Sequence, residues 1–267
     1  MGQPFKVGVI GAGVMGEALI AALISYGVKP ALITISEKRI ERGNELVKQY
    51  GINIAGIEET VSSAEVLLLV VKPQDMAGVL EEIKLSIKPK TVVITFAAGK
   101  KISFVSTGLG TSNPVVRVMP NTATIVGAGM SAVSLGVGVS SEQSKFVLGF
   151  LNATGRVVEV PEDLQDAVTA TSGSGPAYFF SFVEAMILGA QNLGLSYEMA
   201  TQLTVQTIIG AARLLEVSGN SATTLRENVT SPNGTTAAAL ASFDANELKQ
   251  VVSIAMEAAR NRSQELA

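Results

Sequence analysis

The chain contains no histidine, no cysteine and no tryptophan among its 267 residues. Without cysteine it can form no disulfide, thiolate nucleophile or thiolate–zinc site. Without histidine it lacks the side chain that most often acts as general base and as metal ligand. Catalysis therefore has to use carboxylates, hydroxyls, lysines, backbone dipoles or a bound cofactor, and we expect no metal site.

Charged residues are also scarce, at 16% of the chain, and the formal net charge is −3. This balance gives no electrostatic basis for binding nucleic acid or an anionic membrane. Hydrophobic residues make up 47%, a share that predicts extensive burial, including burial in a subunit interface.

Long uninterrupted hydrophobic runs are absent as well. The most apolar stretch, Ala177–Leu195, is interrupted by Glu184, Gln191 and Asn192, so it does not fit a membrane span. The N-terminal segment has one lysine and a very short apolar run before a glycine-rich turn. It predicts a first strand rather than a signal peptide, and a cytoplasmic enzyme.

Short apolar runs alternate with helical patterns in the first part of the chain. Runs that fit strands buried on both faces of a parallel sheet are Phe5–Ile10, Ala31–Ile35, Val66–Val71, Thr91–Thr95 and Val115–Met119. Helical patterns such as Glu17–Tyr26 and Ile40–Tyr50 lie between them, and Met130–Gly136 and Gly155–Val160 look like late strands. This alternation predicts a doubly wound parallel sheet of the Rossmann type.

After Pro161 the pattern becomes helical. The predicted helices are Asp163–Thr171, Pro176–Leu195, Tyr197–Val217, Ala222–Asn228 and Glu247–Leu266, with a run of small residues in helical pattern after Thr236. We therefore predict a dinucleotide-binding domain over 1–161 and an all-helical domain over 162–267. The helix 176–195 is apolar on nearly every face, so it has to be buried by its own domain or by a second subunit.

A glycine-rich turn follows the first predicted strand. The segment "GVIGAGVMG" has the G-x-G-x-x-G spacing between a strand and a helix. The first glycine makes the tight turn, the second admits a pyrophosphate, and the third lets helix and strand pack closely. A fortuitous glycine-rich turn is the alternative. We predict that cofactor contacts come from Gly11, Ala12, Gly13, Val14, Met15 and Gly16.

The end of the second strand distinguishes NAD from NADP. An NAD site has Asp or Glu roughly 20 residues after the glycines, where it accepts from the ribose hydroxyls. This chain has Ser36 there, followed by Glu37, Lys38 and Arg39. A hydroxyl with two cations fits a 2′-phosphate, so we predict NADP. Glu37 leaves NAD open, because it would serve the ribose if the strand ended one residue later.

Other polar or small residues follow later strands at the same predicted sheet edge, where such folds bind ligands. We assign cofactor contacts to Val71, Lys72, Pro73, Ala97, Ala98 and Asn121. Each has a structural alternative as well: Pro73 suits a helix start, and Asn121 would serve as a cap.

Two later segments combine hydroxyls with helix starts. In "TSGSGPAY", Ser174 lies near a predicted N-cap and Pro176 near the first helical position. In "TSPNGTT", Asn233-Gly234 readily takes positive φ after the rigid Pro232. The amides of Gly234, Thr235 and Thr236 would then converge at a helix N-terminus and bind a carboxylate. A capped loop without a ligand is the alternative.

Taken together and in this order, these segments resemble the pyrroline-5-carboxylate reductase family. The matching segments are "GVIGAGVMG", "VVKP", "AAG", "RVMPNT", "SGSGPAY" and "TSPNGTT", spread from residue 8 to 236. The resemblance implies reduction of 1-pyrroline-5-carboxylate to L-proline by NAD(P)H, without itself deciding between NADPH and NADH. It also implies a homodimer with interlocking C-terminal helices, and in some members larger rings of dimers.

The resemblance further implies residue roles. The segment Ser231–Thr236 would bind the substrate carboxylate, and Thr236 would lie near the imine nitrogen. On this basis the substrate residues are Ser174, Ser231, Gly234, Thr235 and Thr236, with Thr236 as the catalytic residue. Two positions depart from the family pattern: Asn233 replaces a common glycine, and Ile57 stands where many members have an asparagine near the adenosine end.

Other functions remain as alternatives. A β-hydroxyacid dehydrogenase would share the two-domain plan, but such enzymes resemble one another in a catalytic lysine on the first long C-domain helix. The only lysine after Gln165 is Lys249, which argues against that reaction. A related imine reductase is a second alternative. A non-catalytic NADP-binding protein is the third, and it would have no use for "SPNGTT".

Overall fold

The computed structural model describes residues 5–266 and divides the chain into two compact units. The first comprises Met1–Ser174 with Ala259–Ala267, and the second comprises Gly175–Ala258. The secondary structure changes from strands to helices near residue 161, but the helical residues up to Ser174 still belong to the first unit. Gln165 shows why, because its buried side chain donates to Ala132 O (3.3 Å) and Ser134 Oγ (2.9 Å) of the sheet.

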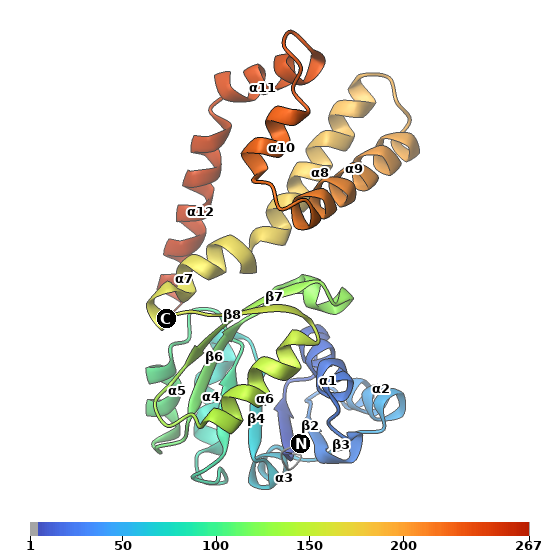
Figure 1. Ribbon diagram of the computed structural model, residues 1–267. Helices are drawn as coiled ribbons and strands as arrows, with labels where there is room; N and C mark the ends of the chain where they lie inside the picture. Colours follow the sequence, from blue (N-terminus) through green and yellow to red (C-terminus); the bar gives the residue numbers. More distant parts are fainter. Residues whose placement is uncertain (1–4, 267) are drawn as a thin grey trace. The chain divides into compact units, whose positions relative to one another are not determined.

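A β-sheet forms the centre of the first unit (Figure 1). It has eight strands in the order β3-β2-β1-β4-β5-β6-β7-β8. The strands are β1 (Val7–Ile10), β2 (Ile33–Ser36), β3 (Asn53–Ile54), β4 (Val66–Leu69), β5 (Val92–Thr95), β6 (Val115–Met119), β7 (Gly129–Leu135) and β8 (Gly155–Glu159). Starting from β3, the order is that of a dinucleotide-binding sheet, with the switch point between β1 and β4. The predicted doubly wound fold is confirmed.

One strand pair departs from the parallel arrangement. β7 pairs with β6 antiparallel, whereas every other neighbouring pair is parallel. A parallel crossover needs a dozen or more residues. The connection from β6 to β7 is shorter and holds only a 3₁₀ turn, Thr122–Val126, so the chain can only turn back beside β6.

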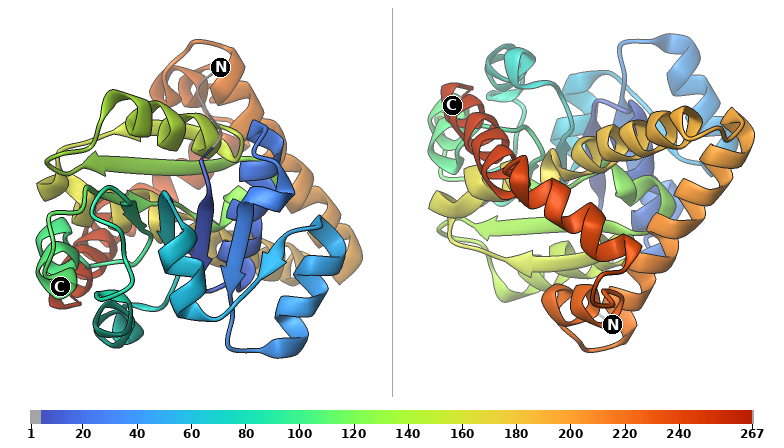
Figure 2. Two further views of the ribbon diagram at one scale, coloured as in Figure 1. Left: turned by 90° about the horizontal axis from the view of Figure 1, so that it is seen from below. Right: turned by 90° about the horizontal axis from the view of Figure 1, so that it is seen from above.

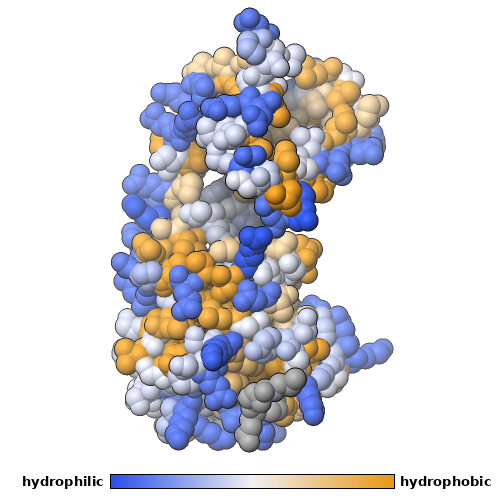
Figure 3. Space-filling view, in the orientation of Figure 1, coloured by the Kyte–Doolittle hydropathy of each residue, from blue (hydrophilic) through white to orange (hydrophobic). Residues whose placement is uncertain are grey.

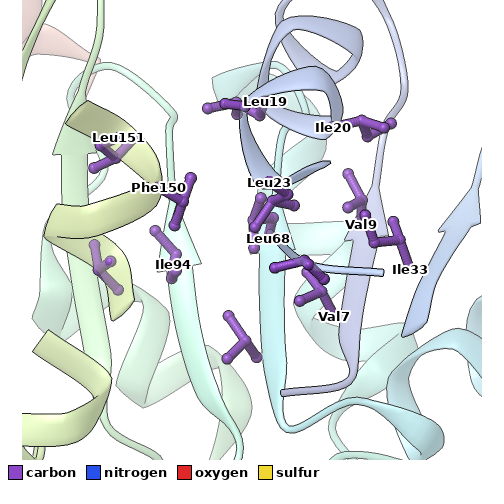
Figure 4. Close-up of a cluster of buried hydrophobic side chains, with 14 of the residues drawn as sticks. Val7, Val9, Leu19, Ile20, Leu23, Ile33, Leu68, Ile94, Phe150 and Leu151 are labelled. Carbon is purple, nitrogen blue, oxygen red and sulfur yellow. The ribbon is translucent and has the colours of Figure 1, made fainter. Parts of the chain in front are cut away.

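Helices cover both faces of this sheet (Figure 2). They are α1 (Val14–Tyr26), α2 (Ile40–Tyr50), α3 (Ile57–Ser63), α4 (Met76–Ile83), α5 (Ile102–Leu109) and α6 (Ser141–Asn152). Successive strand residues point to opposite faces. On β4, Leu68 packs in the cluster with α1 and α6, whereas Leu67 and Leu69 pack in the cluster with α4 and α5. Figure 4 shows the first of these clusters, in which Leu23 and Phe150 meet the strand residues.

The predicted strands differ from the observed ones at a few residues. Ala31 and Leu32 belong to a 3₁₀ turn, Pro30–Leu32, because Pro30 starts a tight turn there. β4 ends at Leu69, so Val70 and Val71 form the loop that follows it. β3 was not predicted, because its two residues are exposed and carry no apolar pattern.

The second unit is helical, as predicted. It contains α8 (Gly175–Asn192), α9 (Tyr197–Val217), α10 (Ala222–Asn228), α11 (Thr235–Ala245) and most of α12 (Leu248–Glu265). Apolar residues reach the surface of this unit (Figure 3). On α8 alone, Phe179, Phe180 and Leu188 are 63%, 64% and 60% exposed, and Gly175 is its only buried residue among those described. The chain by itself therefore does not bury this apolar helix.

The N-cap role predicted for Ser174 is wrong. α7 (Gln165–Val168) continues through a π-helical turn, Thr169–Gly173, towards α8. Ser174 itself has helical dihedral angles, φ −86° and ψ −18°, and its N–H donates to Thr169 O at 2.8 Å. Because the backbone arrives already helical, α8 has no free first turn for Ser174 to cap.

A buried arginine ties the helical ends of the first unit to the sheet. Arg117 on β6 has a 4% exposed side chain and lies 3.5 Å from both Glu162 Oε1 and Asp166 Oδ1. Glu162 also accepts from Ile102 N–H (2.6 Å), and Asp166 from Ser263 Oγ of α12 (2.8 Å). One side chain of the sheet thus connects the start of the helical segment with its end.

Across residues 5–266, no helix has both the length and the hydrophobicity needed to cross a membrane.

Candidate functional site

The glycine turn has the geometry that its sequence predicts. Gly11 follows β1 with φ +88°, and its N–H donates to Ser36 O at 3.0 Å. A Cβ added at Gly11 would come within 2.5 Å of Val70 O, and one added at Gly16 would overlap Gly11 O. Both positions therefore require glycine, which brings the first turn of α1 against β1 and β4.

The same turn leaves room for a pyrophosphate. Within 4 Å, a Cβ added at Gly13 would meet only Arg39 Nη2, at 3.9 Å. Gly13 is the N-cap of α1 and makes no side-chain capping bond, and Val14 after it is 67% exposed. The first N–H groups of a helix have no partner within the helix and favour an anion. These residues fit the diphosphate of a dinucleotide.

A buried carboxylate lies beside this turn. Glu37 Oε2 accepts from Ala12 N–H at 2.9 Å, and Oε1 accepts from the N–H and Nε of Arg39 at 3.1 and 3.0 Å. The Glu37 side chain is 8% exposed, whereas that of Arg39 is 63% exposed. Burial raises the pKa of Glu37, but the hydrogen bonds from Arg39 and Ala12 outweigh it, so the pKa lies below its ordinary value and the group is charged at neutral pH.

The remaining cofactor candidates are placed by the sheet. Ser36 is the last residue of β2, and Lys38 is exposed after it. Val71 Cγ1 lies 3.3 Å from the Cβ position of Gly11, so the loop after β4 borders the glycine turn. Lys72 next to it is exposed, and Pro73 begins a 3₁₀ turn, Pro73–Asp75.

The loops after β5 and β6 contribute less accessible groups. Ala97 is 4% exposed, whereas Ala98 is partly exposed. Asn121 begins the turn after β6, but its side chain does not cap it. Its Oδ1 instead accepts from Met130 N–H at 3.1 Å. The capping alternative is therefore wrong, and Nδ2 is the atom of Asn121 suited to donate to a carboxamide.

The loop predicted to bind the substrate lies in the second unit, before α11. Asn233 has φ +60°, which is the left-handed conformation. Asparagine adopts this conformation more readily than most residues, so it can stand where the family pattern has a glycine. Gly234 is the N-cap of α11, and its N–H donates to Ser231 O at 3.0 Å. The prediction that three amides converge is therefore wrong for Gly234, whose amide closes the turn. The amides of Thr235 and Thr236 remain, because the first turn of a helix gives them no acceptor.

The hydroxyls around these amides are accessible to different degrees. Ser231 and Thr235 are exposed, and Thr236 is partly buried. Two amides and up to three hydroxyls at a helix N-terminus can bind a carboxylate and still leave one hydroxyl for a second polar atom.

The chain matches two family models. "Pyrroline-5-carboxylate reductase dimerisation" matches residues 162–266, and "NADP oxidoreductase coenzyme F420-dependent" matches residues 6–99. A curated pyrroline-5-carboxylate reductase of Pseudomonas aeruginosa is 40% identical over 264 residues, which cover 98% of this chain and 97% of the relative. The chain belongs to the pyrroline-5-carboxylate reductase family.

Solved structures of the family agree along the whole chain. A pyrroline-5-carboxylate reductase from Coxiella burnetii is 33% identical, with a TM-score of 0.92 and 99% coverage of both chains. A Plasmodium falciparum pyrroline carboxylate reductase with NADP bound is 31% identical, with a TM-score of 0.88 and 98% coverage of both.

Sequence reasoning missed how Glu37 is placed in this family member. The sequence predicts for Glu37 only a ribose contact, and only if β2 ended one residue later. β2 does end at Ser36, yet the Glu37 side chain turns back and reaches Ala12, far earlier in the chain. No local pattern predicts this contact, because it depends on β1 and β2 being neighbours in the sheet.

Proposed function

We propose that this chain reduces 1-pyrroline-5-carboxylate to L-proline, with NADPH as the preferred hydride donor. The observation that carries the proposal is the presence, on one chain of this family, of two open helix N-termini suited to two anions. One follows the glycine turn at α1, and the other lies at Thr235–Thr236 in the segment matched by the dimerisation model. The cytoplasmic location stays a prediction from the sequence.

The loop before α11 would bind and orient the substrate. The amides of Thr235 and Thr236 and the hydroxyl of Ser231 would hold the carboxylate, helped by the positive end of the α11 dipole. Ser174 is assigned to the same substrate. Because the carboxylate changes little during the reaction, these contacts contribute mainly to binding.

The Thr236 hydroxyl would face the imine nitrogen. The coenzyme supplies the hydride, and a protonated cyclic imine is electrophilic without further activation. A threonine hydroxyl is too weak an acid to act alone as proton donor. Thr236 would therefore orient the imine or relay a proton from water, and positioning would account for most of the rate. This chemistry needs no imidazole, in agreement with a chain without histidine.

A β-hydroxyacid dehydrogenase would need a lysine that this chain does not offer. Lys249 lies near the start of α12, is 84% exposed and forms an ion pair with Asp244 at 3.8 Å. α8, the first long helix of the second unit, carries no lysine.

A substrate panel tests the proposal. The absorbance of NADPH should fall on adding 1-pyrroline-5-carboxylate, and the absorbance of NADPH should not rise when NADP⁺ is mixed with β-hydroxy acids. The reverse pattern would favour the dehydrogenase, cyclic imines without a carboxylate reacting equally well would favour a related imine reductase, and no change with any substrate would favour a binding protein.

We expect the active form to be a homodimer built by the second unit, with larger assemblies of dimers as the family resemblance implies. The reason is the exposed apolar surface of α8, which costs free energy in water. Sedimentation should show a dimer, and Phe180→Asp should shift it towards monomer with loss of activity. Leu85→Asp is the matched control, because Leu85 is 91% exposed in the first unit. An active, stable monomer at low concentration would contradict the expectation.

We expect NADPH to be preferred through Lys38 and Arg39. Changing both to Gln should raise KM for NADPH more than KM for NADH, because only NADPH carries a 2′-phosphate. Steady-state kinetics with both coenzymes measures this. An equal rise for both would mean that the two cations do not contact the 2′ position.

A further inference from the structure

We propose that Glu37 is the residue that limits the preference of this chain for NADPH, because it competes with the 2′-phosphate for Arg39. The inference deepens the proposed function, on which it rests for the identity of the reaction but not for the binding of coenzyme. It starts from a charged side chain that is only 8% exposed and lies beside the glycine turn.

The two oxygens of Glu37 have different partners. Oε1 organises the turn after β2 by accepting from the N–H and Nε of Arg39. Oε2 crosses to the other segment and accepts from Ala12 N–H between Gly11 and Gly13. A residue needed only for the turn would not have to reach Ala12. The carboxylate therefore lies at the border between the diphosphate position and the end of β2, where the adenosine ribose of such folds is bound.

This position suits a ribose with free hydroxyls. A carboxylate that accepts from the 2′-hydroxyl is the usual means of recognising NAD at this edge of the sheet. For NADH, Glu37 can accept that hydrogen bond while it keeps Arg39. For NADPH, the carboxylate stands close to a phosphate of the same sign, and the repulsion weakens binding.

Arg39 is the group for which the two anions compete. Its Nε is bound to Glu37, whereas Nη2 lies 3.9 Å from the Cβ position of Gly13, on the open side of the turn. A guanidinium can present two parallel N–H groups to a phosphate, but one edge is already occupied by Glu37. A 2′-phosphate therefore has to share Arg39 or displace it from Glu37. Ser36 at the end of β2 and the exposed Lys38 would supply the remaining contacts that favour NADPH.

The test is a binding measurement on the full chain. Glu37→Gln keeps an acceptor for Ala12 N–H but removes the charge. Isothermal titration should show that this variant binds NADPH more tightly and NADH more weakly than the wild type does. The Kd for NADH divided by the Kd for NADPH should therefore rise on the order of tenfold. The variant should also bind adenosine 2′,5′-bisphosphate more tightly and AMP more weakly, because these two ligands carry only the adenosine ends of NADPH and NADH.

A matched control removes the same charge elsewhere. Glu41 lies exposed in the first turn of α2, so Glu41→Gln changes the net charge equally without touching the turn. The Kd values of both coenzymes should then change by the same factor, less than about twofold, since exposed charges are screened. Adding Arg39→Gln to Glu37→Gln should remove the gain for NADPH. Glu37→Asp, which keeps the charge but shortens the side chain, should shift the ratio less than Gln does.

The outcomes separate this proposal from the proposed function. The proposal would be overturned if the ratio of the two Kd values in Glu37→Gln stayed within twofold of the wild-type ratio. It would also be overturned if the variant lost affinity for both coenzymes to the same extent. The proposed function fails separately if the wild-type chain binds coenzyme but does not turn over 1-pyrroline-5-carboxylate.

Discussion

Replacing Arg117 by Met should lower the free energy of unfolding by about 3 kcal/mol, the scale for removing one partner of a buried ion pair. The physical reason is that Glu162 and Asp166, 31% and 16% exposed, would lose their counter-charge. Each keeps one other hydrogen bond, which places the expected loss at the lower end of that scale. The midpoint of thermal unfolding should fall by roughly 6–12 °C.

Arg213→Met is the control for this variant. Arg213 is 70% exposed and pairs with Glu216 on the same helix, α9, so its removal should cost less than about 1 kcal/mol. Arg117→Lys keeps the charge but loses the forked geometry, and its midpoint should lie between those of the wild type and Arg117→Met. Equal midpoints for Arg117→Met and Arg213→Met would show that the cluster contributes nothing to stability.

The second large effect is expected at Thr236. Thr236→Val keeps the shape of the side chain and removes the hydroxyl. If that hydroxyl bonds the imine in the transition state, its removal should cost about 2 kcal/mol of transition-state stabilisation, the scale for a hydrogen bond that involves charge. This loss corresponds to a fall in kcat/KM of roughly 30-fold. Ser231→Ala should instead mainly raise KM, because its hydroxyl contacts a carboxylate that changes little in the reaction.

Both variants should bind NADPH as the wild type does, because the glycine turn belongs to the other compact unit. This is the control for their folding. If Thr236→Val lowers the midpoint of thermal unfolding but leaves kcat/KM within twofold, the loop serves only as the start of α11 and the assignment of Thr236 is wrong.

The sequence was sufficient where local patterns decide the structure. The buried strands β1, β4, β5 and β6 follow from continuous apolar runs, because strands covered on both faces have no polar side to show. The left-handed conformation of Asn233 follows from the Pro-Asn-Gly turn. Because α8 is apolar on nearly every face, the sequence predicted that it has to be buried by its own domain or by a second subunit. The single chain leaves the helix exposed.

Features that depend on distant contacts were not predictable. Glu37 reaches Ala12 only because β1 and β2 are neighbours, and Arg117 gathers carboxylates from a segment far along the chain. The π-helical turn before α8 removes the N-cap site that Ser174 and Pro176 suggested. Likewise, the use of the Gly234 amide inside its own turn depends on the dihedral angles of the folded loop rather than on residue type.

The central claim is that a hydride passes from the coenzyme to the imine carbon of a substrate held by its carboxylate. The most direct measurement is to supply NADPH with deuterium at the transferable position of the nicotinamide, together with 1-pyrroline-5-carboxylate, and to analyse the product by NMR. We predict L-proline with one deuterium, bonded to the former imine carbon, for each coenzyme oxidised. Oxidation of the coenzyme without deuterium at that carbon, or without formation of proline, would contradict the account.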